Sequence, residues 1–165
     1  YLDFTHDIIY TLRGPRQVGK TTFLKVLIDE HLKKGKSPQD LFYYACDLVD
    51  SPKELASIIE NYITARRARS KERLFIFLDE VSCVKTWQNA IKFVCDKGVL
   101  RNTSVIVTGS HSLDMRVSAE RLPGRRGNST DTPDLVLLPM KVAAHILLGL
   151  DSKSGSAQAL AASQH

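Results

Sequence analysis

Residues 14–22 of this chain read Gly14-Pro15-Arg16-Gln17-Val18-Gly19-Lys20-Thr21-Thr22, and they begin with a complete G-x-x-x-x-G-K-T motif. Glycines let the backbone curl into a nest of inward-pointing N–H groups, because no Cβ blocks the approach. A helix that starts after the motif adds free N–H groups and the positive end of its dipole. This stretch therefore predicts a site for a nucleotide triphosphate, in which Lys20 reaches the β- and γ-phosphates and the Thr21 hydroxyl ligates Mg²⁺.

The segments on either side of the motif fit a strand and a helix. Residues 7–13 form a short apolar run rich in β-forming residues, as expected for a buried strand. Residues 22–32 have helical spacing, with Leu24, Leu27, Ile28 and either His31 or Leu32 on one side. The lysines and the glycine at residues 33–35 are typical of a helix end. This context argues against a chance glycine turn.

The alternation of strand and helix continues along the chain. Strands are expected at residues 40–47, 74–78, 104–108 and 134–138, and helices at residues 51–70 and 84–96. The second of these helices should present Trp87, Ala90, Ile91 and Val94 to the core. This order predicts an α/β fold, a three-layer α/β/α sandwich with a mainly parallel five-stranded sheet. Residues 1–150 would form this core, and the Ser-, Ala- and Gly-rich residues 151–165 would form a flexible tail or linker.

A second candidate constellation is Leu78-Asp79-Glu80, at the end of the most apolar predicted strand. In open α/β sheets the ligand binds at the carboxyl ends of the strands, so both carboxylates would project into that crevice. Asp79 would hold Mg²⁺, which takes only one or two protein carboxylates and keeps most of its waters. Glu80 would act as general base on the attacking water. The adjacent Glu80 favours an ATP-hydrolysing enzyme over a small-molecule kinase, because a kinase does not need a water-activating carboxylate at this position.

Two further segments are candidates for contacts with the γ-phosphate. Thr108 ends the fourth predicted strand and Ser110 lies two residues beyond it, and a hydroxyl there would hydrogen-bond the γ-phosphate or the attacking water. The alternative interpretation is an ordinary strand-to-loop turn. Residues 121–127 contain Arg125 and Arg126 beside glycines, and either cation could stabilise charge in the transition state, in its own subunit or across an interface. The alternative interpretation is that these arginines lie on the surface beside flexible glycines and have no role in catalysis.

The bulk properties restrict the class of protein. The chain has 165 residues and 43% hydrophobic residues, enough for one domain with a sizeable core. It contains no apolar stretch long enough to span a membrane and no signal peptide, so a cytoplasmic location is expected. The three cysteines have no metal-binding spacing and are expected to be reduced thiols. The net charge of +5 is concentrated at residues 66–73, where a solvated helix end is favoured over a nucleic-acid contact.

With these residues placed, the chain resembles the bacterial and archaeal AAA-superfamily ATPases, near the STAND and archaeal-ATPase branch. Their phosphate loop reads G-P-R-Q-V-G-K-T-T, as residues 14–22 do. The group also has a Walker B segment with a downstream Trp, which residues 78–81 and Trp87 match. Its T-G-S-x-S sensor segment matches residues 108–112, and its G-R segment matches Gly124-Arg125. The resemblance implies a P-loop NTPase fold, ATP and Mg²⁺ as cofactors, and ATP hydrolysis.

Departures from this group limit what the resemblance implies. His111 stands where Ser is usual, and Leu138-Pro139-Met140 replaces the usual L-P-L-S-F continuation. The chain starts at Tyr1, which suggests an excised fragment that lacks the group's C-terminal half. Hydrolysis would then drive a conformational change in that missing region or in a partner, and an oligomer is possible. The alternative is a slow nucleotide-dependent switch or interaction module with little turnover.

Overall fold

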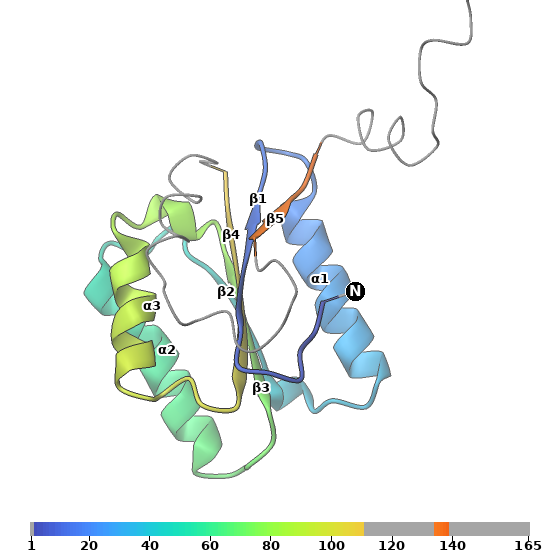
Figure 1. Cartoon of the computed structure of the whole chain (residues 1–165), viewed down its shortest axis with the longest axis vertical. Coiled ribbons are helices and arrows are strands. Elements are labelled where there is room, and N and C mark those ends of the chain that lie inside the picture. The colour runs from blue at the N-terminus through green and yellow to red at the C-terminus, as the bar shows by residue number, and fades with distance from the viewer. Residues whose placement is uncertain (1, 111–133, 139–165) are drawn as a thin grey trace, which may run out of the picture.

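Strands and helices alternate along the chain in the computed structural model, which describes residues 2–110 and 134–138 (Figure 1). Five strands and three helices position the site: β1 (Ile9–Arg13), α1 (Lys20–Lys33), β2 (Leu41–Ala45), α2 (Pro52–Arg67), β3 (Leu74–Asp79), α3 (Trp87–Asp96), β4 (Thr103–Gly109) and β5 (Asp134–Val136). Short 3₁₀ turns at Pro38–Asp40 and Val81–Cys83 precede β2 and follow β3. No helix in these described ranges is long and apolar enough to cross a membrane.

The five strands form one sheet in the order β2-β3-β4-β1-β5, and every described pairing is parallel. The connection after β1 crosses to the far edge of the sheet through α1, whereas β4 lies directly beside β1. The chain therefore leaves the two neighbouring strands β1 and β4 in different directions, which opens a crevice at their carboxyl ends. This is the topological position at which open α/β sheets bind ligands.

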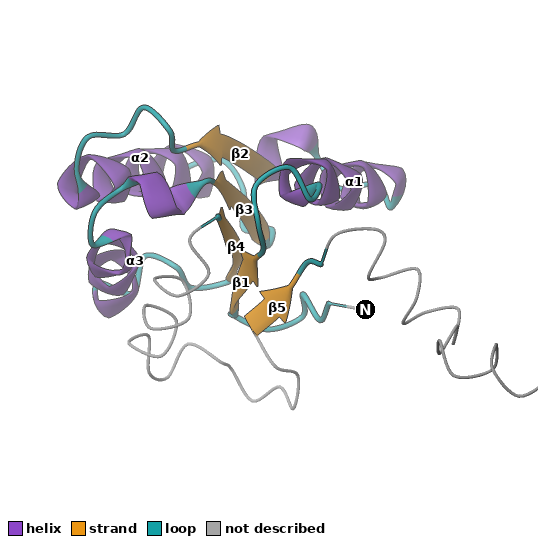
Figure 2. Ribbon diagram, turned by 90° about the horizontal axis from the view of Figure 1, so that it is seen from above, coloured by secondary structure: helices purple, strands orange, loops and turns teal. Residues whose placement is uncertain are grey.

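Helices cover both faces of the sheet. Figure 2 shows α1 on one face and the pair α2 and α3 on the other, so the predicted three-layer α/β/α sandwich is confirmed. Successive residues of β3 alternate between two clusters: Phe75 and Phe77 pack with α1, whereas Ile76 and Leu78 pack with α2 and α3. All six residues of β3 are buried, as its continuous apolar sequence predicts for a central strand.

The start of α2 is capped by side chains, close to the predicted start at residue 51, whereas α3 begins later than predicted. The Ser51 hydroxyl accepts the Glu54 N–H at 3.2 Å, and the Glu54 carboxylate accepts the Asp50 N–H at 3.0 Å. For α3 the predicted start at residue 84 is wrong, because Val84 is extended and the helix begins at Trp87 after a 3₁₀ turn. The predicted core face of α3 is confirmed, since Trp87, Ala90, Ile91 and Val94 are all buried.

Polar side-chain contacts that the sequence pattern does not reveal hold strand β5 against β1. The Asp134 carboxylate accepts a hydrogen bond from the Thr11 hydroxyl at 2.9 Å and forms an ion pair with Arg13 at 3.1 Å. The backbone then runs beside the phosphate loop, and the Leu137 N–H donates to the Arg13 carbonyl at 2.8 Å. The end of β5 therefore packs directly against Gly14, the first residue of the loop.

Substitution of Gly14 by Ala should disrupt this packing. An added Cβ at residue 14 would collide with the Leu137 carbonyl oxygen, which is a backbone atom and cannot rotate away. We expect a loss of stability of about 1–3 kcal/mol, typical of overpacking, and displacement of the loop. Thermal unfolding with and without nucleotide measures both effects. An alanine variant as stable as the wild type would contradict this close approach.

Helical spacing leaves open whether His31 or Leu32 lies on the buried face of α1, and the structure places His31 there. Its side chain is buried beside aromatic rings, with the ring centroid of Phe75 at 4.2 Å and that of Phe4 at 5.0 Å, whereas Leu32 is exposed. Burial lowers the pKa of His31 below its usual value, and the charges of Lys34 and Lys36 lower it further against the opposing charge of Glu30.

The buried imidazole predicts a pH-dependent stability. In the unfolded chain His31 binds a proton with a pKa near 6.5, whereas in the folded chain it does so only at lower pH. The free energy of unfolding should therefore fall as the pH drops through 6.5 and level off below the pKa of the folded state. Unfolding midpoints at pH 7.5 and 5.5 should therefore differ less for His31→Leu than for the wild type. Equal differences in the two proteins would exclude a contribution of His31 to the pH dependence of stability.

Candidate functional site

The loop between β1 and α1 lies at the carboxyl edge of the sheet, where the crevice opens. Two of its residues have positive φ, Gln17 at 62° and Gly19 at 96°, which turns successive backbone amides within the loop. Gly19 is the N-cap of α1, and this cap receives no side-chain hydrogen bond and has no acidic residue in the first helical turn. The positive end of the α1 dipole is therefore available to an anion.

Lys20 lies inside this loop, with only 4% of its surface exposed. Its ammonium group donates to the carbonyl oxygens of Gly14 at 3.0 Å and Pro15 at 2.9 Å. It also donates to the Ser110 hydroxyl at 3.0 Å, which joins the loop after β1 to the end of β4. The three acceptors at hydrogen-bond distance are all neutral, and a phosphate would be a stronger partner for this cation.

The Asp79 carboxylate lies at the end of β3 and accepts four hydrogen bonds. Its Oδ2 receives the hydroxyls of Thr21 at 2.6 Å and Tyr43 at 2.9 Å. Its Oδ1 receives the Thr108 hydroxyl at 2.5 Å and the Glu80 N–H at 3.1 Å. Burial raises the pKa of Asp79, but these donors together outweigh burial and lower the pKa below its usual value. Asp79 is therefore an ionised and rigidly oriented carboxylate.

The pair of Thr21 and Asp79 suits magnesium. Magnesium prefers hard oxygen donors and is held by one or two carboxylates together with substrate phosphates and water. The hydroxyl and the carboxylate are hydrogen-bonded to each other beside the loop that would carry the phosphates. Across residues 2–110 and 134–138 no group of three or more His, Cys, Asp or Glu side chains is placed to hold a metal ion.

Glu80 follows Asp79 in a left-handed backbone conformation, with φ at 49°. Its Oε1 accepts the Ser110 hydroxyl at 2.6 Å and lies 3.6 Å from the Lys20 ammonium nitrogen. The first residue of α1 and residues that follow β3 and β4 therefore meet in one cluster of Lys20, Glu80 and Ser110. This is the place where a γ-phosphate bound by Lys20 and a water beside Glu80 would be neighbours.

The two hydroxyls at the end of β4 have different surroundings. Thr108 is fully buried, donates to Asp79 and accepts the Glu80 N–H at 3.0 Å. It therefore holds the Asp79 carboxylate and the backbone of Glu80. Ser110 is half-buried and contacts both Lys20 and Glu80. Of the two candidates for the phosphate sensor, the geometry favours Ser110.

The remaining predicted site residues are only partly brought to this cluster. Pro15, Arg16 and Gln17 form the exposed rim of the loop, Val18 is half-buried beneath it, and Thr22 is exposed one residue beyond Thr21 on α1. The loop backbone, rather than these side chains, would bind phosphate. Arg125 and its neighbours at residues 121–127, and the expected tail at residues 151–165, lie outside the described residues.

Tyr43 is a residue of this site that the sequence pattern did not indicate. It belongs to β2, whose residues pair with β3, and its hydroxyl reaches the same Asp79 oxygen as Thr21 does. Only the strand order places β2 beside β3, and that order is not readable from hydrophobic periodicity. The run of three aromatic residues at 42–44 is the available signal, but it predicts a strand without indicating which residues that strand will face.

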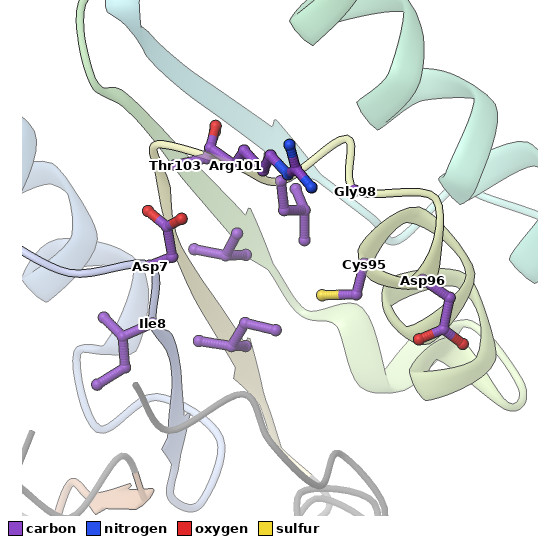
Figure 3. A pocket seen from close by; sticks show the side chains of 10 residues that line it. Asp7, Ile8, Cys95, Asp96, Gly98, Arg101 and Thr103 are labelled. Carbon is purple, nitrogen blue, oxygen red and sulfur yellow. The ribbon is translucent and has the colours of Figure 1, made fainter. Parts of the chain in front are cut away.

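A pocket of about 330 Å³ lies at the opposite edge of the sheet, near the first residues of β1 and β4. Figure 3 shows Asp7 and Ile8 across this pocket from Cys95 and Asp96 at the end of α3. No residue of the phosphate loop is among the described residues that line it. It is therefore separate from the candidate nucleotide site.

The basic run at residues 66–73 contributes mainly to the fold. Arg66 pairs with the buried Asp40 at 2.6 Å, and Arg73 pairs with Asp7 at 3.0 Å. Arg67 donates to the carbonyl oxygens of Glu72, Arg101 and Asn102. These three guanidinium groups already contact acceptors within the chain, which reduces the charge that this run offers to a nucleic acid.

Comparison with known proteins relates this arrangement to one family. A family model described as an AAA domain matches residues 6–144, which is most of the chain. No curated protein matches the sequence.

Solved structures support the fold. The Orc1 protein of Aeropyrum pernix, in complex with DNA, is 17% identical and covers 79% of this chain with a TM-score of 0.52. Cdc6p from Pyrobaculum aerophilum is 14% identical and covers 85% with a TM-score of 0.54. The chain spans only 39% and 42% of these two proteins. At such identities the likeness shows the fold alone, and that fold is the predicted P-loop NTPase fold.

Proposed function

The chain belongs to the AAA domain family, and from this premise we propose that it is a Mg²⁺-dependent P-loop ATPase domain that binds ATP and hydrolyses its β-γ phosphoanhydride bond. The observation that carries the proposal is the meeting of the Lys20 ammonium, the Thr21–Asp79 pair and the Glu80 carboxylate at the carboxyl edge of the sheet. The family alone would support nucleotide binding. The water-activating carboxylate beside Lys20 is what favours hydrolysis.

Each residue of the cluster has a chemical part in this proposal. Backbone N–H groups of residues 14–19 and the start of α1 would bind the phosphates, with Lys20 on the γ-phosphate. Thr21 would ligate Mg²⁺ and Asp79 would support it. When bound, magnesium would neutralise negative charge on the phosphate oxygens. Glu80 would accept a proton from the attacking water, and Ser110 would orient Glu80 toward the γ-phosphate.

Some elements of the proposal concern regions or partners beyond the described residues. Arg125 would supply a transition-state cation, in its own subunit or across an oligomer interface. Hydrolysis would drive a conformational change in a further domain or a protein partner, in a cytoplasmic setting. A contact with DNA is a weaker proposal, supported by the Orc1 structure in complex with DNA and opposed by the internal contacts of Arg66, Arg67 and Arg73.

A slow nucleotide-dependent switch is the second candidate. The observation in its favour is that Ser110 bonds both Lys20 and Glu80, so that the cation and the base hold each other through one hydroxyl until nucleotide separates them. A switch of this kind would bind nucleotide tightly and turn it over slowly.

Phosphate release across a range of protein concentrations, with and without DNA, distinguishes the candidates. The ATPase proposal expects steady turnover of Mg²⁺-ATP that EDTA abolishes. A rise in turnover per chain with concentration would indicate a shared site with an arginine supplied by a neighbour. Tight binding without turnover under every condition would contradict the ATPase and favour the switch.

A further inference from the structure

We propose that Tyr43 is a positioning residue for magnesium: its hydroxyl holds Oδ2 of Asp79 and would yield this oxygen to a hydrated ion that binds with nucleotide. The inference rests on the proposed function, because it concerns the metal of that same site. It assigns a role to the edge strand β2, which carries none of the residues of the phosphate loop or of the segment after β3.

The hydrogen bonds to Asp79 leave little acceptor capacity. A carboxylate has about four lone-pair sites, and Asp79 already accepts four donors in this structure. A hydrated magnesium ion beside Thr21 would present its own water O–H groups to the same carboxylate. One of the present donors must therefore leave before Asp79 can support the ion.

Three of the four donors are poorly suited to leave. The Thr108 side chain is fully buried within β4, and the Glu80 donor is a backbone N–H. Thr21 is fixed on the first turn of α1 and is itself the proposed metal ligand. Displacing any of these would disturb the loop, the sheet or the carboxylate pair.

Tyr43 is the donor that can leave at low cost. It lies on β2, the edge strand of the sheet, and 37% of its surface is exposed, so a displaced hydroxyl would be solvated by water. It also binds Oδ2, the oxygen that Thr21 contacts and the one nearest to the proposed metal. Burial, followed by the hydrogen bond and the charge of Asp79, raises the pKa of Tyr43 to about 12, so its hydroxyl remains a neutral donor at physiological pH.

Tyr43→Phe tests this role through metal-dependent binding. Mg²⁺ is titrated into the 165-residue chain with a fluorescent, non-hydrolysable ATP analogue, and the Mg²⁺ concentration at half-maximal binding is measured. Removal of the competing hydroxyl should lower this midpoint about three- to tenfold, a change that corresponds to the net contribution of one ordinary hydrogen bond. Binding of the analogue in EDTA should change by less than about twofold. Tyr43→Leu, which also lacks the hydroxyl, should shift the midpoint in the same direction.

Tyr44→Phe is the matched control. It removes a hydroxyl from the next residue of the same strand, whose ring stacks on Phe42 at the α2 side of the sheet. Its Mg²⁺ midpoint should equal that of the wild type. An unchanged or raised midpoint in Tyr43→Phe, with normal binding by the wild type, would overturn this inference alone. Failure of the wild type to bind the analogue at any Mg²⁺ concentration would overturn the proposed function together with it.

Discussion

Replacement of Lys20 by Met should reduce the affinity for Mg²⁺-ATP at least about thirtyfold. The ammonium group is buried at the centre of the loop and, in the proposed complex, forms charge-assisted bonds to phosphate, each with a net value of about 1.5–3 kcal/mol. Methionine keeps much of the side-chain volume and removes the charge. Equilibrium titration with a fluorescent ATP analogue measures the loss.

The control for this variant is Lys25→Met on the exposed surface of α1. It removes the same charge from the same helix and should leave affinity within about twofold of the wild type. Because Lys20 also binds the carbonyl oxygens of Gly14 and Pro15, thermal unfolding must show that the variant remains folded. Wild-type affinity in a folded Lys20→Met protein would exclude this loop as the phosphate site.

Glu80→Gln should leave nucleotide binding intact and reduce turnover about a hundredfold or more. Loss of a positioned general base costs 10²- to 10⁴-fold in rate. The amide of Gln has nearly the same shape as the carboxylate and can still accept the Ser110 hydroxyl, so the cluster with Lys20 should persist. Phosphate release under saturating Mg²⁺-ATP measures the rate, and the analogue titration measures binding.

Glu60→Gln serves as the control for the loss of a carboxylate. Glu60 lies on α2 and pairs with Lys97 near the surface, where such a pair contributes little to stability. Its turnover should match that of the wild type. If Glu80→Gln turned over ATP as fast as Glu60→Gln, Glu80 would not be the base.

The fold could be predicted from local sequence patterns because each pattern has a direct physical cause. The continuous apolar run of β3 requires burial on both faces, and the alternation of strands with helices favours parallel pairing through crossovers. The predicted start of α3 is wrong because the apolar residues Val81 and Val84 extend the helical spacing toward the N-terminus of the helix. Both are buried, but in a 3₁₀ turn and an extended residue rather than in a helix.

The candidate site was predictable only where its residues are close in sequence. The loop at residues 14–22 and the pair Asp79-Glu80 each signal their chemistry in a few consecutive positions. The distinction between Thr108 and Ser110 depends on which side of β4 each hydroxyl faces at the strand end, and Tyr43 depends on the strand order. Such relations come from tertiary packing, and no local pattern encodes them.

The most direct test of the central claim is equilibrium binding of a fluorescent ATP analogue to the wild-type chain in Mg²⁺. The arrangement of Lys20, Thr21 and Asp79 predicts saturable binding of one nucleotide per chain, displaced by excess ATP and weakened by EDTA. Absence of saturable binding by the folded protein would contradict the assignment of this crevice as a nucleotide site.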